Sequence, residues 1–377
     1  MKLDPYNHQQ KYHDWKSKAL QSGIPNLKKE NSDKIINFIL EMELGLNVSA
    51  KSVKGSRSPV HLNNLRQRMI FITRHLEKRH NNVSLDNVTE EMLFSLFNDM
   101  RNGQLKRVDG KTYQSATDFV KVFKSFWHWH MKANKKKGKL LEDITTDLDT
   151  SKEKPKWVYF TEDQFNRLVN NATPRIRTLM MFLYDTGIRA PTELMNIKVS
   201  DFYNDFQELE IRNEISKTFG RRIKLMLCSD CIKEFIATKK LNPDDFVFKI
   251  NYASVNRSLK ELARKVLGDE KSPAGQKYSE LTMYDFRHNS CCYWLPRYKS
   301  ESALMYRFGW KKSDKIHYYS ELLGMKDTIT KADLELEKSN KFEPQNKDAE
   351  KEMLRNRLAL MEQQMKQLME MAYRVNA

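Results

Sequence analysis

The chain has 377 residues, of which 40% are hydrophobic and 31% charged, and its formal net charge at pH 7 is +17. The excess of Lys and Arg occurs both in residues 1–150 and in residues 151–377, which indicates a polyanionic partner that contacts much of the protein, although solubility alone would also explain it. No run of about 18 apolar residues could cross a bilayer, and the first ten residues, MKLDPYNHQQ, hold no apolar signal region. We therefore expect a cytoplasmic protein without membrane contact.

Four cysteines occur, Cys228 and Cys231 with CxxC spacing and the adjacent pair Cys291 and Cys292. A zinc site would need a second pair at ribbon spacing, and adjacent cysteines are poor partners in one tetrahedral site. We favour reduced thiols over a metal site, and we expect no cofactor.

Residues 1–25 are polar, contain Pro5 and Pro25, and are predicted to form an extended arm. Helical periodicity follows in four stretches, at 31–45, 60–80, 89–101 and 113–134. Asn31 or Ser32 is a plausible cap for the first of them. No strand pattern interrupts these stretches, so residues 26–147 are predicted to form a helical bundle.

Residues 113–134 carry an apolar aromatic stripe, with Lys121 and Lys124 largely off it and a run of further lysines after it. These lysines are either a solvated face or a contact to a phosphate backbone, and charge alone does not decide between the two. Lys121 and Lys124 are our candidates for contact with a polyanion.

Residues 148–156 are polar, end near Pro155, and are predicted to be a linker to a second domain at 157–335. A helix is expected to start at Thr161, which resembles the first residue of a capping box. Strand character at 207–212 and 221–227, joined by a turn that includes Lys217, predicts a small antiparallel hairpin. The remaining sequence to about 325 is mainly helical, so the fold class is mainly α with a small antiparallel sheet.

Residues 336–377 are predicted to form a C-terminal helical tail. Seven apolar residues in it repeat with alternating spacings of four and three, which is typical of a coiled-coil seam. They are Leu354, Leu358, Met361, Met365, Leu368, Ala372 and Val375. We favour self-association or docking on a neighbouring subunit slightly over a helix packed on its own domain.

Three separated segments carry the residues of greatest chemical interest. The first reads Thr-Gly-Ile-Arg189 with Glu193 four residues later, the second Tyr284-Asp-Phe-Arg287-His288, and the third Gly309-Trp310 with a tyrosine nine residues on. Together they resemble the signature of the tyrosine recombinases, the family of phage integrases, Xer and Cre-like enzymes. Each motif is weak alone, but their order and spacing behind a basic helical region are specific.

The resemblance implies a two-domain DNA clamp, with a helical core-binding domain followed by the catalytic domain. It implies that Arg189 and Arg287 stabilise the charge on a scissile phosphate. Lys217, which matches the hairpin lysine of the family, would protonate the leaving oxygen. Tyr319 would be the nucleophile that forms a 3′-phosphotyrosine, which conserves bond energy so that rejoining needs neither ATP nor metal.

Three positions depart from the usual pattern of the family. Tyr284 replaces a histidine, and a phenol is a poor base because its ordinary pKa is about 10. Either His288 or the arginine-biased field around Tyr319 itself is a candidate to compensate. Trp310 replaces another histidine, and its indole N–H can still donate to phosphate. Glu193 follows Arg189 by four residues rather than three and is expected to orient an arginine.

Tyr318 competes with Tyr319 for the role of nucleophile, and the nine-residue spacing from Trp310 favours Tyr319. Arg221 and Arg222, beside the hairpin turn, join the candidates for DNA contact. The sequence after Tyr319 resembles that of archaeal-type integrases, which suggests an integrase of an archaeon or of an archaeal virus or plasmid.

The sequence thus predicts a site-specific DNA recombinase of a mobile element, of prokaryotic or viral origin. Double-stranded DNA would be its partner, with a homo-tetramer on DNA and a monomer or dimer when free. Two alternatives stay open. One is a DNA-binding protein with impaired catalysis, because Tyr284 replaces histidine. The other is a telomere resolvase or topoisomerase-like enzyme with the same active site.

Overall fold

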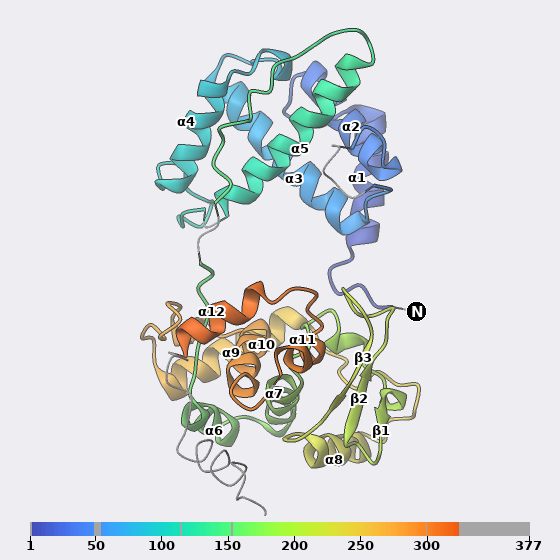
Figure 1. The fold of residues 1–377 in the computed structure, drawn as a ribbon, viewed down its shortest axis with the longest axis vertical. Helices are drawn as coiled ribbons and strands as arrows, with labels where there is room; N and C mark the ends of the chain where they lie inside the picture. Colours follow the sequence, from blue (N-terminus) through green and yellow to red (C-terminus); the bar gives the residue numbers. More distant parts are fainter. Residues whose placement is uncertain (1, 49–53, 114, 152–153, 299, 324–377) are drawn as a thin grey trace, which may run out of the picture. The chain divides into compact units, whose positions relative to one another are not determined.

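The computed structural model describes residues 2–48, 54–113, 115–151, 154–298 and 300–323 (Figure 1). Within these ranges the fold consists of α-helices, short 3-10 turns and one three-stranded antiparallel sheet. The predicted fold class, mainly α with a small antiparallel sheet, is confirmed. The predicted tail at 336–377, with its apolar repeat, lies outside the described residues. None of the helices in the described ranges is long and apolar enough to cross a membrane.

The chain divides into two compact units. Among the described residues, the first comprises those of 2–290 and 307–309, and the second comprises those of 291–306 and 310–323. The predicted domain boundaries near 147 and 157, and the predicted clamp, stay predictions.

Among the described residues of the first part of the chain, five helices share one apolar core that runs from Tyr12 to Leu148. They are α1 (His8–Ser22), α2 (Lys29–Leu44), α3 (Pro59–Arg79), α4 (Glu90–Arg101) and α5 (Ala116–Lys135). The aromatic stripe of α5 is buried in this core, with Phe123, Phe126 and Trp127 at most 3% exposed. Four of these helices match the stretches predicted from apolar periodicity.

Residues 8–22 correct the expectation of an extended arm, because they form α1, which packs on α3. Tyr12 and Ala19, two turns apart, are the buried residues of α1. The Asp4 carboxylate accepts the backbone N–H of His8 at 2.5 Å and so satisfies a donor at the start of the helix. Two buried positions among polar neighbours give too weak a periodicity to recognise in the sequence.

The start of α2 also differs from the expectation, since the helix begins at Lys29 and neither Asn31 nor Ser32 caps it. Both side chains are buried and make tertiary hydrogen bonds instead. The Asn31 amide donates to Glu77 at 2.7 Å, and the Ser32 hydroxyl accepts the N–H of Ile24 at 2.8 Å. Buried polar groups need such partners, so these two residues stabilise the core rather than the helix end.

The later helices are α6 (Glu162–Asn170), α7 (Pro174–Thr186), α8 (Ser229–Lys239), α9 (Tyr252–Leu267), α10 (Met283–Trp294), α11 (Glu301–Phe308) and α12 (Asp314–Leu322). At the start of α6 a full capping box is present. The Thr161 hydroxyl accepts the N–H of Gln164 at 3.2 Å, and the Gln164 side chain accepts the N–H of Thr161 at 3.0 Å. The helix start predicted at Thr161 is therefore confirmed.

The sheet has the order β1 (Phe202–Tyr203), β2 (Glu208–Ile211) and β3 (Arg221–Lys224). Leu209 pairs with Ile223, and both are buried, as alternation along two antiparallel strands requires. The predicted hairpin is confirmed. The two-residue strand β1 is too short to show a pattern in the sequence.

A buried carboxylate near the end of α7 ties together elements that are far apart in the sequence. One oxygen of Asp185 accepts the backbone N–H groups of Met226, Leu227 and Cys228 at 2.9, 2.7 and 3.1 Å. The other oxygen pairs with the Arg307 guanidinium at 2.7 Å, and both side chains are at most 2% exposed. Asp185 thus fixes the connection between β3 and α8, and the end of α11, to α7.

We predict that Asp185→Asn destabilises the protein strongly. The amide removes the negative charge that pairs with Arg307 at a buried position, and breaking a buried pair in this way costs about 3–5 kcal/mol. The measurement is urea unfolding followed by circular dichroism. The matched control is Asp205→Asn, whose exposed pair with Lys233 has a similar length of 2.7 Å and should contribute little. Equal losses in both variants would contradict the role of Asp185.

Candidate active site

The turn after α7 brings Arg189 into the site. Gly187 closes the helix with φ of 58°, in the left-handed region that favours glycine. A Cβ atom there would lie 2.3 Å from the Phe308 ring, so a side chain has no space. The glycine of the Thr-Gly-x-Arg motif therefore has a physical cause, because only glycine allows this turn beside the buried Phe308 ring.

Three hydrogen bonds, two to Glu193 and one to Gly309, hold Arg189, whose side chain is 14% exposed. One guanidinium nitrogen donates to Glu193 at 2.6 Å, and another donates to the carbonyl of Gly309 at 2.9 Å. The backbone N–H of Arg189 also donates to Glu193, at 3.0 Å. The predicted orienting role of Glu193 fits this geometry.

Arg221 is the second partner of Glu193, at 3.0 Å, and neither side chain is more than 1% exposed. Burial alone would raise the pKa of Glu193, but the charges of Arg221 and then Arg189 outweigh it and lower the pKa to about 2. Arg221 also donates to the carbonyl of Arg307 at 2.8 Å. The structure therefore differs from our expectation that Arg221 contacts DNA, because its side chain is enclosed and committed to Glu193.

Arg287 lies on α10 and is 3% exposed. Its guanidinium donates to the carbonyl of Gly187 at 2.5 Å and to that of Phe308 at 2.5 Å. Burial, followed by the positive charge of nearby Arg189, lowers the pKa of Arg287. Two neighbouring cations in a desolvated setting favour a nearby anion, and Glu193 already pairs with one of them.

The residues two positions before and after Arg287 anchor α10. The Asp285 carboxylate accepts the N–H of Val158 at 3.0 Å, and the Asn289 amide oxygen accepts that of Phe160 at 2.9 Å. Sequence reasoning did not single out Asp285 or Asn289. Their spacing of four, on the helix that carries Arg287, was the available signal.

Tyr284 is 44% exposed at the start of α10. Its ring lies 5.3 Å from that of His288, which stacks on Trp157 at 4.8 Å. The structure thus places the two predicted residues together, with Tyr284 toward solvent and His288 against an aromatic ring.

Lys217 is exposed in the connection between β2 and β3, residues 212–220. The next residue, Thr218, donates its hydroxyl hydrogen to the carbonyl of Gly309 at 2.8 Å. This carbonyl also accepts from Arg189, so the turn that carries Lys217 and the arginine share one acceptor.

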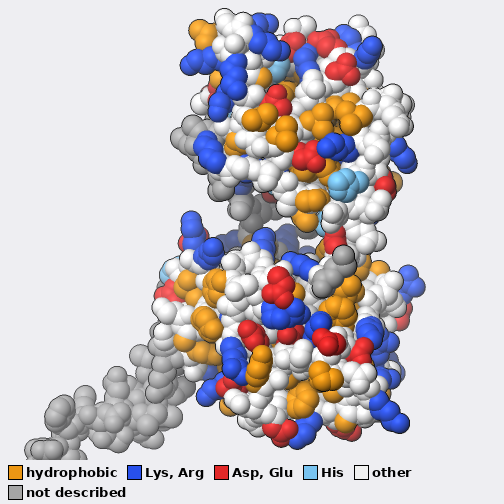
Figure 2. Space-filling model, turned by 90° about the vertical axis from the view of Figure 1, so that its right-hand side faces the viewer, with side chains coloured by type: hydrophobic (Ala, Val, Ile, Leu, Met, Phe, Trp, Pro, Cys, Tyr) orange, Lys and Arg blue, Asp and Glu red, His pale blue; other side chains and the backbone are white. Residues whose placement is uncertain are grey.

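The other predicted DNA contacts lie in different settings. Lys121 is exposed. The Lys124 amine instead donates to the carbonyl of Thr145 at 2.5 Å. Arg222 is exposed, lies over the ring of Tyr203 at 3.8 Å and pairs with Glu208 at 2.8 Å. On the face drawn in Figure 2, Lys and Arg side chains are widely spread among acidic and apolar ones rather than gathered in one patch.

In the second unit, Trp310 and Tyr319 stack face to face, with ring centroids 6.0 Å apart and planes 6° from parallel. Both are buried, Tyr319 to 3% exposure. Tyr318 is only partly buried and meets the ring of Tyr319 edge-on at 5.3 Å. The two candidate nucleophiles on α12 therefore occupy clearly different environments.

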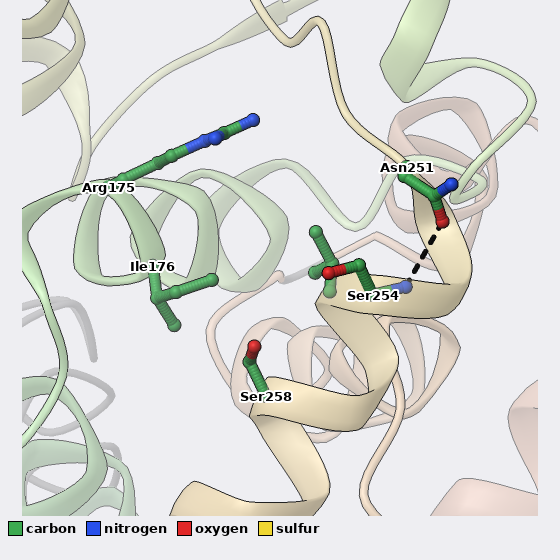
Figure 3. A pocket seen from close by; sticks show the side chains of 6 residues that line it. Arg175, Ile176, Asn251, Ser254 and Ser258 are labelled. Atoms are coloured by element: carbon green, nitrogen blue, oxygen red, sulfur yellow. Dashed lines mark hydrogen bonds between the residues drawn. The ribbon is translucent and has the colours of Figure 1, made fainter.

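Two other features lie apart from these residues. A pocket of about 310 Å³ at the starts of α7 and α9 is lined by Arg175, Asn251 and Ser254 among others, and by none of the motif residues (Figure 3). Burial raises the pKa of both the Cys228 and the Cys231 thiols. In the part of the chain that the structure describes, no three His, Cys, Asp or Glu side chains are grouped to hold a metal ion.

The fold of this part of the chain is similar to that of tyrosine recombinase catalytic domains. Residues 158–324 match the phage integrase family, so this part of the chain is similar to that family. No curated protein sequence matches the chain.

Three solved structures share the fold. A lambda integrase tetramer bound to a Holliday junction matches with TM-score 0.55 and 15% identity, over 79% of this chain and 78% of that one. The XerH recombinase bound to a palindromic difH substrate matches with TM-score 0.55 and 13% identity, over 85% and 94%. The Tn1549 transposon integrase bound to a circular intermediate DNA matches with TM-score 0.55 and 13% identity, over 76% and 94%.

We predict that Glu193→Gln lowers stability at neutral pH and removes part of its acid dependence. The folded-state pKa of about 2 lies below the ordinary value of about 4.3. Stability from Glu193 is therefore complete above about pH 5 and is lost as the pH falls toward 2. The difference between wild type and variant should be about 3 kcal/mol at pH 7 and should shrink toward pH 2. Denaturant unfolding across this range measures it.

The control for this prediction is Glu261→Gln, which changes an exposed glutamate on α9. It should alter neither the stability at pH 7 nor the acid profile. A constant gap between wild type and Glu193→Gln from pH 7 to pH 2 would show that the Glu193 charge does not stabilise the fold.

Proposed function

We propose that the protein is a site-specific DNA recombinase that cleaves and rejoins strands through Tyr319. The observation that carries the proposal is the pair Arg189 and Arg287. Both guanidiniums are held by backbone carbonyls, and burial, followed by the positive charge of the first, lowers the pKa of the second. Such a fixed, desolvated pair suits the charge that develops on a phosphate during transfer.

The reaction that we propose is a phosphoryl transfer. The phenolic oxygen of Tyr319 attacks the scissile phosphorus, the bond from phosphorus to the 5′ oxygen breaks, and a 3′-phosphotyrosine forms. Arg189 and Arg287 donate to the nonbridging oxygens. Lys217 gives a proton to the departing 5′ oxygen. The reverse attack by a 5′ hydroxyl on another strand rejoins the DNA, so the cycle requires neither nucleotide nor metal.

Removal of the Tyr319 proton is the step that departs from the common pattern of the family. Tyr284 stands in the position of the usual histidine, and its half-exposed phenol can hydrogen-bond a phosphate. We propose that it binds rather than acts as a base, since its ordinary pKa is about 10. His288, whose ring contacts that of Tyr284, is the candidate base.

The burial of Tyr319 sets a condition for this chemistry. A side chain with 3% exposure does not reach a phosphate in solution. We propose that the α12 segment shifts when DNA binds, so that the phenol becomes accessible. A nucleophile buried until DNA is present would not react with small electrophiles in the free protein.

Assembly on DNA follows the same proposal. The lambda integrase structure with the same fold is a tetramer on a Holliday junction. We propose that four copies of this chain act on two DNA sites and that the tail at 336–377 supports the contact between subunits. A protein with impaired catalysis stays the second candidate, and the replacement of histidine by Tyr284 is the observation that favours it.

We predict that Tyr319→Phe abolishes the covalent DNA adduct and keeps DNA binding, because only the nucleophilic oxygen is lost. A pool of nicked duplexes with randomised sequence first selects DNA that wild type traps covalently in the presence of EDTA. Adduct formation is then followed on denaturing gels. The matched control, Tyr318→Phe, removes the neighbouring hydroxyl and should retain the adduct. The reverse result would assign the nucleophile to Tyr318.

We predict that Arg189→Lys lowers the cleavage rate by about 10²–10³-fold, which is the cost of one lost transition-state donor. The charge stays, so affinity for the selected DNA at fixed salt should change little, since it is one phosphate contact among many. The control, Arg175→Lys, makes the same exchange at an exposed arginine beside the pocket in Figure 3 and should alter neither quantity. Parallel losses of binding and cleavage in Arg189→Lys would contradict a role in the transition state.

A further inference from the structure

The turn that carries Lys217 is fixed to the arginine cluster on both sides of the lysine. The Thr218 hydroxyl donates to the carbonyl of Gly309 at 2.8 Å. On the other side, the Ser216 hydroxyl donates to Glu193 at 3.4 Å and accepts the N–H of Thr218 at 3.3 Å. Lys217 itself is exposed, so its backbone is anchored while its side chain extends into solvent.

The Gly309 carbonyl is the point where this anchor meets the catalytic arginine. It accepts from Arg189 at 2.9 Å as well as from Thr218. Gly309 has φ of 60°, and a Cβ atom there would lie 3.2 Å from the Thr218 oxygen and 2.8 Å from an Arg221 nitrogen. The close approach of the turn to residue 309 thus depends on the absence of a side chain.

Arg189 and the Lys217 turn are both bound to the Gly309 carbonyl, and this matters because the proposed reaction needs Arg189 and Lys217 at the same phosphate. Arg189 would bind a nonbridging oxygen while Lys217 protonates the departing oxygen of the same phosphate. A long side chain on a loose loop would spend much of its time out of reach, and restricting that freedom beforehand is a large part of the advantage of an intramolecular reaction. The shared carbonyl couples the position of the acid to that of the phosphate-binding arginine.

We propose that Thr218 is a positioning residue for the acid step, whose hydroxyl holds the Lys217 turn against the Gly309 carbonyl beside Arg189. This inference rests on the proposed function and adds a specific role for a residue outside the signature motifs. It requires that loss of the hydroxyl weakens protonation of the leaving group and leaves phosphate binding by the arginines intact.

The test uses the selected nicked duplex in two forms, one with the ordinary 5′ bridging oxygen at the scissile phosphate and one with sulfur in its place. Cleavage of either forms the bond from the Tyr319 oxygen to phosphorus. The oxygen leaving group needs a proton, whereas sulfur departs as a thiolate, the stable anion of an acid with a pKa of about 8.5. A defect confined to the acid step therefore disappears on the sulfur substrate.

Thr218→Val, which keeps the shape and removes the hydroxyl, should cleave ordinary DNA about tenfold more slowly, a change of about 1.4 kcal/mol in the barrier. It should cleave the sulfur-bridged DNA at the wild-type rate. Thr218→Ser, which keeps the hydroxyl, should stay near wild type on both. Lys217→Ala should show a larger loss with the same rescue, and Arg189→Lys should show a loss that sulfur does not rescue.

The outcomes distinguish failure of the positioning role of Thr218 from failure of the proposed recombinase function. A Thr218→Val defect that persists on sulfur-bridged DNA, while Lys217→Ala is rescued, would overturn the positioning role and leave the recombinase proposal standing. Full activity of Thr218→Val on ordinary DNA would overturn it as well. Failure of sulfur to rescue Lys217→Ala would remove the acid role of Lys217 and the inference with it. Absence of any adduct with wild type would overturn the proposed function itself.

Discussion

The arrangement of the site depends on one buried carboxylate, Glu193, which stands between two arginines. One oxygen pairs with Arg189 and the other with Arg221. Without this charge two guanidiniums would be enclosed together, at a cost of several kcal/mol. Because Glu193 also accepts the backbone N–H of Arg189, a single side chain sets both the direction of the Arg189 guanidinium and the path of the backbone at that residue.

Backbone carbonyls, together with Glu193, orient the guanidinium groups of the site. The carbonyls of Gly187, Phe308 and Gly309 accept from Arg287 or Arg189, and each comes from a segment whose fold is set by glycine or by a helix end. Carbonyls orient the Arg287 guanidinium without neutralising it, whereas Arg189 also pairs with Glu193. This explains why sequence segments more than a hundred residues apart must keep their local shape together.

Much of the fold was predictable because apolar periodicity is strong in α2 to α5 and because β2 and β3 alternate. The helix α1 was missed, since only Tyr12 and Ala19 mark its buried side. In the site, the motif spacing identified Arg189, Glu193 and Arg287. It did not show that Arg221 is buried. A basic residue beside a turn is usually exposed, and only the structure shows that Glu193 pairs with Arg221. Nor did the sequence indicate the role of Thr218, which depends on a carbonyl 91 residues away.

The neighbouring cations Arg189 and Arg287 have a consequence for handling the protein as well as for its chemistry. Enclosed like charges lower the free energy of unfolding, and a bound oxyanion would recover it in proportion to its occupancy. Sulfate or inorganic phosphate in the buffer should therefore raise the melting temperature more than an equal ionic strength of chloride does. On the function proposed above, a DNA phosphate bound beside the two arginines would have the same effect, so the melting temperature would measure how fully the site is occupied.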